Sequence, residues 1–367
     1  MSTITLSPDA AERQPASAFS VATARALVND LFTPNPWIYW PDFLVTTGLG
    51  YAAAAVYLTA DNFSLLQIAA LIVAAFALFR TGTYIHEIVH LRKGTLPGFV
   101  LAWNVLVGVP MGTPSSFYAN HADHHSKTDY GTPQDGEYLP FTHSSRQHLL
   151  LYAIQPLIIP ILAIIRFVVL APLSAVIPPL RRFVEERASS YVSNPYYRKE
   201  PGRLVPPRIF LLAEAATSAL YIALAIGFAT GYLPLEALAK VYVLAVFGIA
   251  LNWLRNLGGH RFDSLGLPIS HAAQFKDSVT IEGTLLTELL FPLGLRYHAI
   301  HHLFPTMPYH ALPVAHRRFL AELPPEFGYR DTIYPSLWWL LRRLWREAGR
   351  GHDTAAIQRW QARAKAA

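Results

Sequence analysis

Three short segments of this chain hold eight of its fifteen histidines, at residues 86–90, 121–125 and 298–302. Within each segment the imidazoles are spaced so that a helix would place them on one face. A tetrahedral zinc ion takes about four ligands, so eight imidazoles exceed the needs of one ion. The pattern therefore predicts a site for two metal ions, built where distant parts of the chain meet. The predicted ligands are His86, His90, His121, His124, His125, His298, His301 and His302.

The composition narrows both the chemistry and the setting. The chain has no cysteine, which excludes disulfides, thiolate metal sites and iron–sulfur clusters and leaves imidazole and carboxylate as metal ligands. Hydrophobic residues make up 52% and charged residues 15%, a balance typical of an integral membrane protein. The formal net charge is +6, but the basic residues lie beside apolar segments. This arrangement favours anionic lipid headgroups as partners and argues against nucleic acid.

Four apolar runs are long enough to cross a bilayer, which takes about 20 residues. They cover about residues 37–59, 64–85, 209–232 and 235–255. Residues 97–113 are apolar but short and rich in Gly and Pro, which predicts an interfacial piece. For residues 149–180, which are interrupted by prolines and by Arg166, we expect two broken helices lying in or dipping into the membrane face. Arg166 would reach toward the headgroups, and a kinked third span is the alternative.

The distribution of Lys and Arg predicts how the spans are oriented. The turns near Asp61 and Pro234 contain neither residue, whereas the other loops contain nearly all of them. By the positive-inside rule, both termini and all three histidine segments are then cytoplasmic, as is the active site that they would form.

The predicted fold is all-α and integral to the membrane, with four transmembrane helices and a cytoplasmic helical cap that holds the histidine-rich site for two metals. We divide the chain into an N-terminal cytoplasmic segment (1–36), a membrane domain (37–318) and a C-terminal segment (319–367). Residues 336–346 of the last segment mix Trp, Leu and Arg. This mixture is typical of an interfacial helix, or of an ordinary amphipathic helix packed on the cytoplasmic side.

The first histidine segment, considered alone, has a second interpretation. His86, Glu87 and His90 form the His-Glu-x-x-His pattern of a zinc metalloprotease, in which the glutamate is the general base. A protease of that type needs one further ligand rather than six more histidines. A membrane zinc protease is therefore a distant alternative.

The order of spans and histidine segments resembles the integral-membrane fatty acid desaturase family, which includes hydroxylase relatives. Two spans, two histidine segments, two spans and one more histidine segment follow one another from about residue 37 to about residue 318. The resemblance implies an Asn-x-x-x-His element after the fourth span, and Asn256 and His260 stand there. His260 is then a further metal ligand, and Asn256 reaches a metal directly or through water.

By the same resemblance the metals are two iron ions, and zinc can replace them in purified or overexpressed protein because the same imidazoles bind both. The reaction takes O₂ as a co-substrate, since attacking an unactivated methylene is beyond amino-acid side chains. Nearby acceptors are expected to hold the second nitrogen of the ligating imidazoles. The candidates for this supporting role are Glu87, Asp123, Asp129, Asp135, Asp263, Glu288, His310 and His316.

The resemblance implies a desaturase that introduces a double bond into a fatty acyl chain held as a CoA thioester, a carrier-protein thioester or a membrane lipid. The main alternative is a hydroxylase or ketolase with the same metal site, acting on an acyl lipid, a sphingolipid or a carotenoid. A membrane protein that has kept the fold without the activity is a further interpretation. We expect an external donor, a ferredoxin or a small haem protein, to deliver two electrons at the basic cytoplasmic face.

Overall fold

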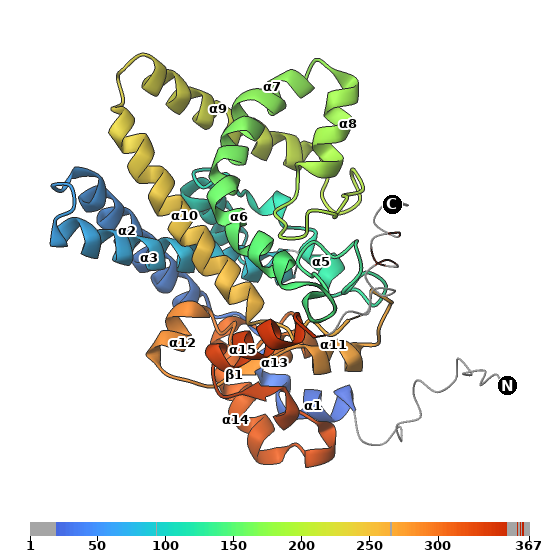
Figure 1. The fold of residues 1–367 in the computed structure, drawn as a ribbon. Helices are drawn as coiled ribbons and strands as arrows, with labels where there is room; N and C mark the ends of the chain where they lie inside the picture. The colour runs from blue at the N-terminus through green and yellow to red at the C-terminus, as the bar shows by residue number, and fades with distance from the viewer. Residues whose placement is uncertain are drawn as a thin grey trace.

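The computed structural model describes residues 20–350 except Lys93 and Leu265, together with Gln358, Trp360 and Ala362. Its regular structure is mostly helical (Figure 1), as predicted. The described strands, β1 (Thr280–Ile281) and β2 (Ile333–Tyr334), form one short parallel pair. Most of the predicted N-terminal segment, residues 1–19, lies outside the described residues, and so does most of the chain after residue 350.

The first helical hairpin consists of α2 (Pro36–Thr59) and α3 (Leu65–His90). The side chains of Asn35 and Ser64 accept hydrogen bonds from backbone N–H groups in the first turns of the two helices. These caps satisfy N–H groups that have no partner inside the helix, and so mark where each helix begins. The last turns of α3 carry the first histidine segment, which therefore lies at the opposite end of the hairpin from its turn.

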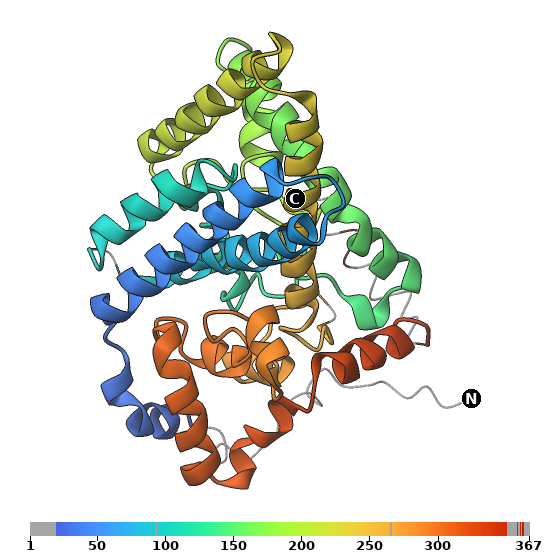
Figure 2. The ribbon, with the colours of Figure 1, turned by 90° about the vertical axis from the view of Figure 1, so that its left-hand side faces the viewer.

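The second hairpin consists of α9 (Pro207–Ala229) and α10 (Leu235–Leu257), and α10 packs across α3 (Figures 1 and 2). Phe76 of α3 and Phe247 of α10 meet edge to face, with ring centroids 6.2 Å apart. The chain reaches His260 just after α10 ends. In both hairpins, histidines therefore lie at or just beyond the end opposite the turn: His86 and His90 in α3, and His260 after α10.

The segment predicted to form two broken interfacial helices is instead one continuous helical run. It consists of α6 (Arg146–Ile164), a π-helical turn η6 (Ile165–Leu170) and α7 (Ala171–Ser174). The widening to a π-helix lies just before Pro172, whose ring nitrogen has no hydrogen with which to continue the α-helical ladder.

Among the described residues, four helices have the length and apolar composition of a membrane span: α3, the run from α6 to α7, α9 and α10. Three of them correspond to predicted spans. The fourth corresponds to the alternative of a kinked span at residues 149–180. The predicted first span forms α2, a helix of 24 residues that is not among these four.

The chain leaves the histidine-bearing side at the start of α6 and returns to it after α8 (Pro178–Arg187). At the start of α6, Nε of Arg146 donates to the backbone oxygen of Trp345 at 3.0 Å. Beyond α8, the N–H of Ser193 donates to the carbonyl of Gly136, in the loop that follows the second histidine segment, at 2.9 Å. All three histidine segments therefore share one side of the molecule, and the assignment of that side to the cytoplasm stays a prediction.

A buried ion pair joins the α6–α7 run to α9. Arg166 of η6 contacts Glu214 of α9, and both side chains are 7% exposed. Nη1 of Arg181 donates to the other carboxylate oxygen of Glu214 at 2.5 Å. Arg166 therefore does not reach toward lipid headgroups as predicted, because Glu214 and the carbonyl of Ala188 hold its guanidinium inside the protein.

Replacing Arg166 by methionine should destabilise the folded protein. Glu214 would keep only Arg181 as a partner, and removing one member of a buried ion pair costs about 3 kcal/mol. Thermal unfolding in detergent measures the effect. Arg182→Ala is the matched control, because Arg182 is largely exposed and its pair with Glu186 should contribute little. An unchanged midpoint for Arg166→Met would show that the pair does not contribute to stability.

A cap of short helices covers the histidine-bearing ends of the long helices, shown in orange and red below the long helices in Figures 1 and 2. Its main helices are α11 (His271–Asp277), α12 (Leu285–Leu290), α13 (His298–Leu303), α14 (Leu312–Glu322) and α15 (Leu337–Glu347). Helix α1 (Val21–Leu27) packs against α14. The remaining short helices are η2 (Asn29–Leu31), α4 (Pro97–Trp103), η3 (Asn104–Gly108), η4 (Ser115–Phe117), α5 (His121–His124), η5 (Phe141–His143), η7 (Tyr309–Ala311), η8 (Pro325–Phe327) and η9 (Arg330–Thr332).

Candidate metal centre

Nine imidazoles from four parts of the chain converge between the long helices and the cap. The end of α3, helix α5 with the residue after it, the loop after α10, and helix α13 supply them. Seven of the nine residues are at most 5% exposed, and His90 and His125 are partly exposed. All eight histidines of the three segments and His260 are thus brought together.

The imidazoles form two groups of four. The first group is His86, His90, His121 and His301, and the second is His124, His260, His298 and His302. Within each group, one ring nitrogen from every residue lies within 4.8 Å of the others. In the second group, Nε2 of His260 is 3.0 Å from Nε2 of both His124 and His298. Two nitrogens bound to one ion through bonds of about 2.1 Å lie roughly 3.0–3.4 Å apart, so this spacing suits one ion per group.

His125 lies between the two groups. Its Nε2 is 3.1 Å from Nε2 of His121 and 3.1 Å from Nε2 of His301, which places it with the first group as a fifth imidazole. Its ring also stacks on that of His302 in the second group, with centroids 4.3 Å apart. The two groups are therefore neighbours, as a site for two metals requires.

Several buried ring nitrogens have no hydrogen-bond partner among the described residues. They include both nitrogens of His86, both nitrogens of His302 and Nε2 of His90. A polar atom buried without a partner costs free energy. A metal ion in each group would bind the nitrogens that face it, so the donor set fits two ions.

The protonation state of the rings also suits a metal. Burial and the neighbouring imidazoles hold the pKa values of His298, His301 and His302 well below their usual range. These rings are therefore neutral at pH 7, and neutral imidazole is the form that binds metal ions.

Two carboxylates from the loop after α5 hold the second nitrogens of two imidazoles. Glu137 contacts Nδ1 of His121, and Asp135 contacts Nδ1 of His124 at 2.8 Å. Burial by itself raises the pKa of Glu137, but the neighbouring His121, His124 and Arg255 together outweigh it and hold that pKa below its usual range. Such contacts fix the orientation of a ring and leave Nε2 free for the metal.

A tyrosine and an aspartate hold His260 in the same way. The hydroxyl of Tyr130 donates to Asp277 at 2.6 Å and lies 2.9 Å from Nδ1 of His260. Because the tyrosine hydrogen goes to Asp277, the tyrosine oxygen accepts the hydrogen on Nδ1 of His260. This assigns the tautomer whose Nε2 carries a lone pair toward the second group. Tyr138 donates to the same oxygen of Asp277 at 2.9 Å.

Asn256 lies in the last turn of α10, buried beside the site. Its amide nitrogen donates to the hydroxyls of Tyr152 and Ser193, at 3.0 and 3.3 Å, and to the backbone oxygen of Glu137 at 3.4 Å. The amide thus ties α10 to the loop that carries Glu137. Its role as a metal ligand stays a prediction.

Of the predicted supporting carboxylates, Asp135 is the one that contacts a ligating ring, and several others pair elsewhere. Glu87 accepts from the hydroxyl of Tyr39 at 2.5 Å and from the N–H of Tyr309 at 3.2 Å, which ties α3 to α2 and η7. Asp123 pairs with Arg203 at 2.5 Å. The position of Glu87 also gives no support to its use as a protease base.

The remaining candidates likewise contact other partners. Asp263 pairs with Arg343 and Glu288 pairs with Arg296, whereas the bond from the N–H of Thr132 reaches the backbone oxygen of Asp129 and does not engage its carboxylate. His310 accepts from the N–H of Asn35 at 3.2 Å, and Nδ1 of His316 lies 2.6 Å from the hydroxyl of Tyr329. The predicted support from Asp263, His310 and His316 is therefore not what the structure shows, because arginines, a backbone N–H and a tyrosine engage these groups.

Sequence reasoning missed Glu137, Tyr130 and Asp277. A signal existed for Glu137, because Asp135 and Glu137 are two acidic residues in a polar loop soon after the second histidine segment. We found no such signal for Tyr130 or Asp277, whose contact joins residues 147 positions apart.

Acidification should destabilise the metal-free protein. Burial lowers the pKa values of five imidazoles, those of His125, His260, His298, His301 and His302, whereas Asp135 helps to raise that of His124. Below about pH 6.5 the unfolded chain binds protons at the five histidines whose pKa values are lowered, and the folded chain does not. Protons therefore favour unfolding. The free energy of unfolding should therefore be steady above that pH and fall below it. Thermal unfolding after chelation, at about pH 7.5 and about pH 5.5, tests this; equal midpoints would contradict it.

The fold and the site together define a helical protein with span-like apolar helices and a histidine-rich site that could hold two metal ions. Comparison with known proteins shows that it is a membrane oxidoreductase of lipid metabolism. The sequence model of the fatty acid desaturase family matches residues 62–335. The chain is also similar to a ceramide hydroxylase of Caulobacter vibrioides (strain NA1000 / CB15N), with 35% identity over 340 residues, 91% of this chain and 95% of the relative. The chain therefore belongs to the fatty acid desaturase family, and the predicted resemblance is confirmed.

Proposed function

We propose that this protein is an O₂-dependent lipid hydroxylase that acts on a ceramide or a closely similar amide-linked lipid. The observation that carries the proposal is the similarity to a ceramide hydroxylase over nearly the whole length of both chains. The nine converging imidazoles support it, because they supply two groups of donors for two iron ions. Desaturation of an acyl chain, the function predicted first from the sequence, is the second candidate, supported by the family match.

The proposed reaction replaces a C–H bond of the lipid by C–OH. One oxygen atom of O₂ enters the product and the other leaves as water, with two electrons and two protons supplied by an external donor such as a ferredoxin or a small haem protein. The bound irons would supply the oxidising power that side chains lack. The chain's own residues bury the site and orient the rings through Glu137, Asp135 and Tyr130.

The position of the site suits a substrate that stays in the membrane. Imidazoles of the site lie at the ends of α3 and α10, two helices that are long and apolar enough to cross a membrane. A lipid can therefore approach from the bilayer, which agrees with a ceramide better than with a soluble thioester.

The test is lipid analysis by mass spectrometry of a ceramide-producing host that expresses this chain under ¹⁸O₂. We expect a ceramide that has gained one labelled oxygen atom. The product should be absent with His301→Ala and present with His271→Ala, an exposed histidine outside the site. A new lipid that has lost two hydrogens and carries no label would show desaturation instead. If the host's lipids are unchanged while the purified protein carries iron, the reaction is repeated in vitro with added reduced ferredoxin and ceramide. Absence of hydroxylated ceramide in that reaction would contradict the proposal.

A further inference from the structure

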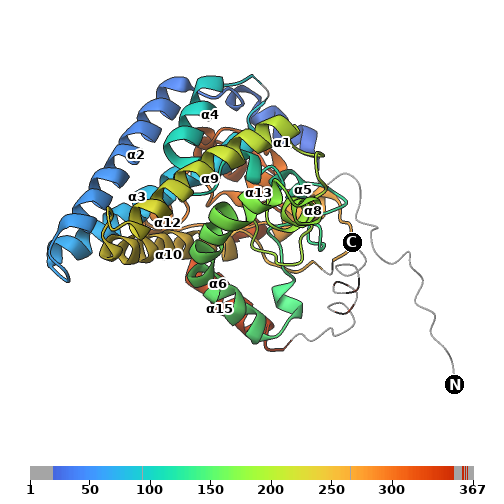
Figure 3. The same cartoon turned by 90° about the horizontal axis from the view of Figure 1, so that it is seen from above.

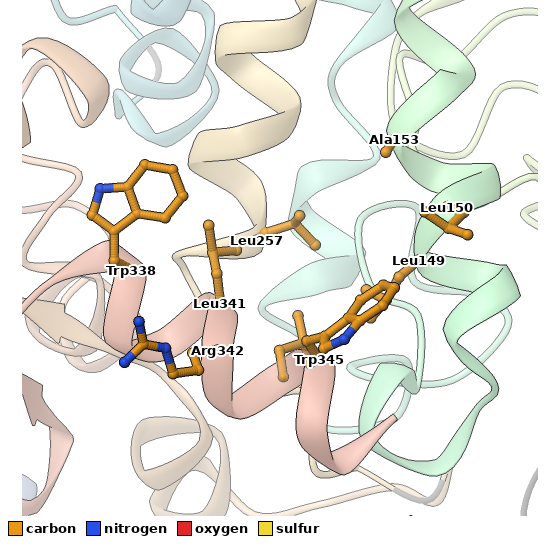
Figure 4. A pocket seen from close by; sticks show the side chains of 9 residues that line it. Leu149, Leu150, Ala153, Leu257, Trp338, Leu341, Arg342 and Trp345 are labelled. Atoms are coloured by element: carbon orange, nitrogen blue, oxygen red, sulfur yellow. The ribbon is translucent and has the colours of Figure 1, made fainter. Parts of the chain in front are cut away.

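A groove separate from the metal centre lies between α15 and the ends of two apolar helices (Figure 4). Its cavity volume is about 440 Å³. Leu150 and Ala153 of α6 form one wall, Leu257 at the end of α10 forms the back, and Trp338, Leu341 and Trp345 of α15 form the other wall. The lining is almost wholly apolar, and Arg342 stands at its edge.

Helix α15 has one face in the protein core and one face outside it. Leu337, Leu340 and Leu344 are buried. On the other side, Trp338 is 69% exposed and Trp345 is 43% exposed. Tryptophan exposed beside arginine on an amphipathic helix is typical of the boundary between lipid tails and headgroups.

The groove opens onto the exposed apolar surface of α6. Leu150 lies in the second turn of α6 and Leu257 is the last residue of α10, so the groove lies where two apolar helices end. The α6 surface beyond it stays apolar and exposed, with Leu151 58%, Ile154 45% and Leu157 50% exposed. Seen from above, α15 lies along the same side of the molecule as α6 (Figure 3). An acyl chain of the bilayer can therefore run from the membrane into the groove without crossing a polar barrier.

The rim of the groove is positively charged. Arg342 lines the groove, and Arg346 follows one helical turn later on α15. Both are exposed, and neither forms an ion pair with any described residue, although Nε of Arg346 donates to the backbone oxygen of Arg342 at 3.3 Å. Arg146 adds a third guanidinium, 5.1 Å from the ring centroid of Trp345. Arg343, by contrast, is neutralised by Asp263 and Glu347. The rim therefore offers unpaired positive charge next to an apolar groove.

We propose that this groove binds an anionic phospholipid of the surrounding membrane. One acyl chain lies against Leu150 and Ala153, and the headgroup phosphate pairs with Arg342 and Arg346, since arginine and phosphate make strong charge-assisted hydrogen bonds. The lipid holds α15, and with it the cap, at the membrane face. The proposal does not depend on which reaction the metal centre performs.

The test is the amount of phosphatidylglycerol that stays with the full-length protein. The protein is reconstituted in nanodiscs of phosphatidylglycerol and phosphatidylcholine, extracted in mild detergent, and its retained lipids are counted by native mass spectrometry. Arg342→Glu with Arg346→Glu should lower the retained phosphatidylglycerol, by roughly fivefold for each arginine. Arg317→Glu, an exposed arginine of α14, makes the same charge change away from the groove and should have no effect.

A second variant tests the apolar part of the groove without changing charge. Ala153 is exposed on α6, so Ala153→Phe can fill the groove without disturbing the core, and it should also lower lipid retention. Retention equal to the wild type in both the double charge variant and Ala153→Phe would overturn the proposal. Equal retention of phosphatidylcholine and phosphatidylglycerol would also overturn it. A third result would overturn it as well: a wild-type protein that is a dimer, and an Ala153→Phe variant that is a monomer with unchanged lipid retention. The occupant of the groove would then be a second copy of the chain.

Discussion

Replacing His301 by alanine should weaken binding of the metal ion of the first group and leave the ion of the second group in place, whereas His302→Ala should do the reverse. The two residues are adjacent, yet His301 lies with His86, His90 and His121, and His302 lies with His124, His260 and His298. Each variant should keep about half of the wild-type metal and lose product formation by more than about a thousandfold, because both ions act in one reaction.

Metal analysis of the purified variants, together with the lipid analysis, checks this expectation. Spectroscopy should then show different environments for the remaining ion. His302→Ala keeps the ion of the first group with its five imidazoles, and His301→Ala keeps the ion of the second group with its four. His316→Ala is the control, since His316 contacts Tyr329 outside both groups. Loss of both ions in both variants would show that the two groups bind metal only as a unit, and full activity in either would refute the site.

Glu137→Gln should weaken metal binding in the first group by about 10- to 100-fold, the usual effect of losing a carboxylate behind a ligating histidine. The change removes the negative charge beside Nδ1 of His121 and also weakens the bond from the hydroxyl of Tyr118, which is 2.9 Å from Glu137. Asp135→Asn is the matched change in the second group, because Asp135 holds His124.

Competition with a chelator measures the affinity of each group. Asp263→Asn is a useful control, since sequence reasoning selected Asp263 but the structure pairs it with Arg261 and Arg343. If Asp263→Asn weakens metal binding as much as Glu137→Gln, the carboxylate contacts seen here do not determine the affinity.

Local patterns predicted the long helices well and the intervening region poorly. The apolar runs at 64–85, 209–232 and 235–255 form α3, α9 and α10, because a helix of about 20 apolar residues is specified by its own composition. The run from α6 to α7 was expected to break at its prolines. It stays helical, with a π-helical turn before Pro172 and a buried pair between Arg166 and Glu214, a partner that no local pattern indicates.

The supporting residues of the metal centre show the same limit. Asp135 could be listed from the sequence but not preferred over Asp123 or Asp263, because all three are acidic residues near histidines or arginines. Which of the three contacts a ligating histidine depends on the ion pairs that they form. Asp123 pairs with Arg203 and Asp263 pairs with Arg343, whereas Asp135 contacts His124.

The sequence by itself determined the kind of centre, since the imidazole count, the absence of cysteine and the helical spacing are all local properties. The sequence did not determine which histidine belongs to which metal ion, although helix geometry agrees with part of the grouping that the structure shows. Residues four apart lie about 40° apart around a helix, whereas neighbours lie about 100° apart. In agreement, the pairs His86 and His90, His121 and His125, and His298 and His302 each stay in one group.

Only the tertiary structure decided which middle histidine completes which group. His301 joins the residues from α3 and α5, and His124 joins those from α13 and the loop after α10. The middle residue of each of these two segments therefore belongs to a different group from the outer pair of its own segment. Their assignment depends on how α5 and α13 face each other, which is a matter of packing between segments more than 170 residues apart.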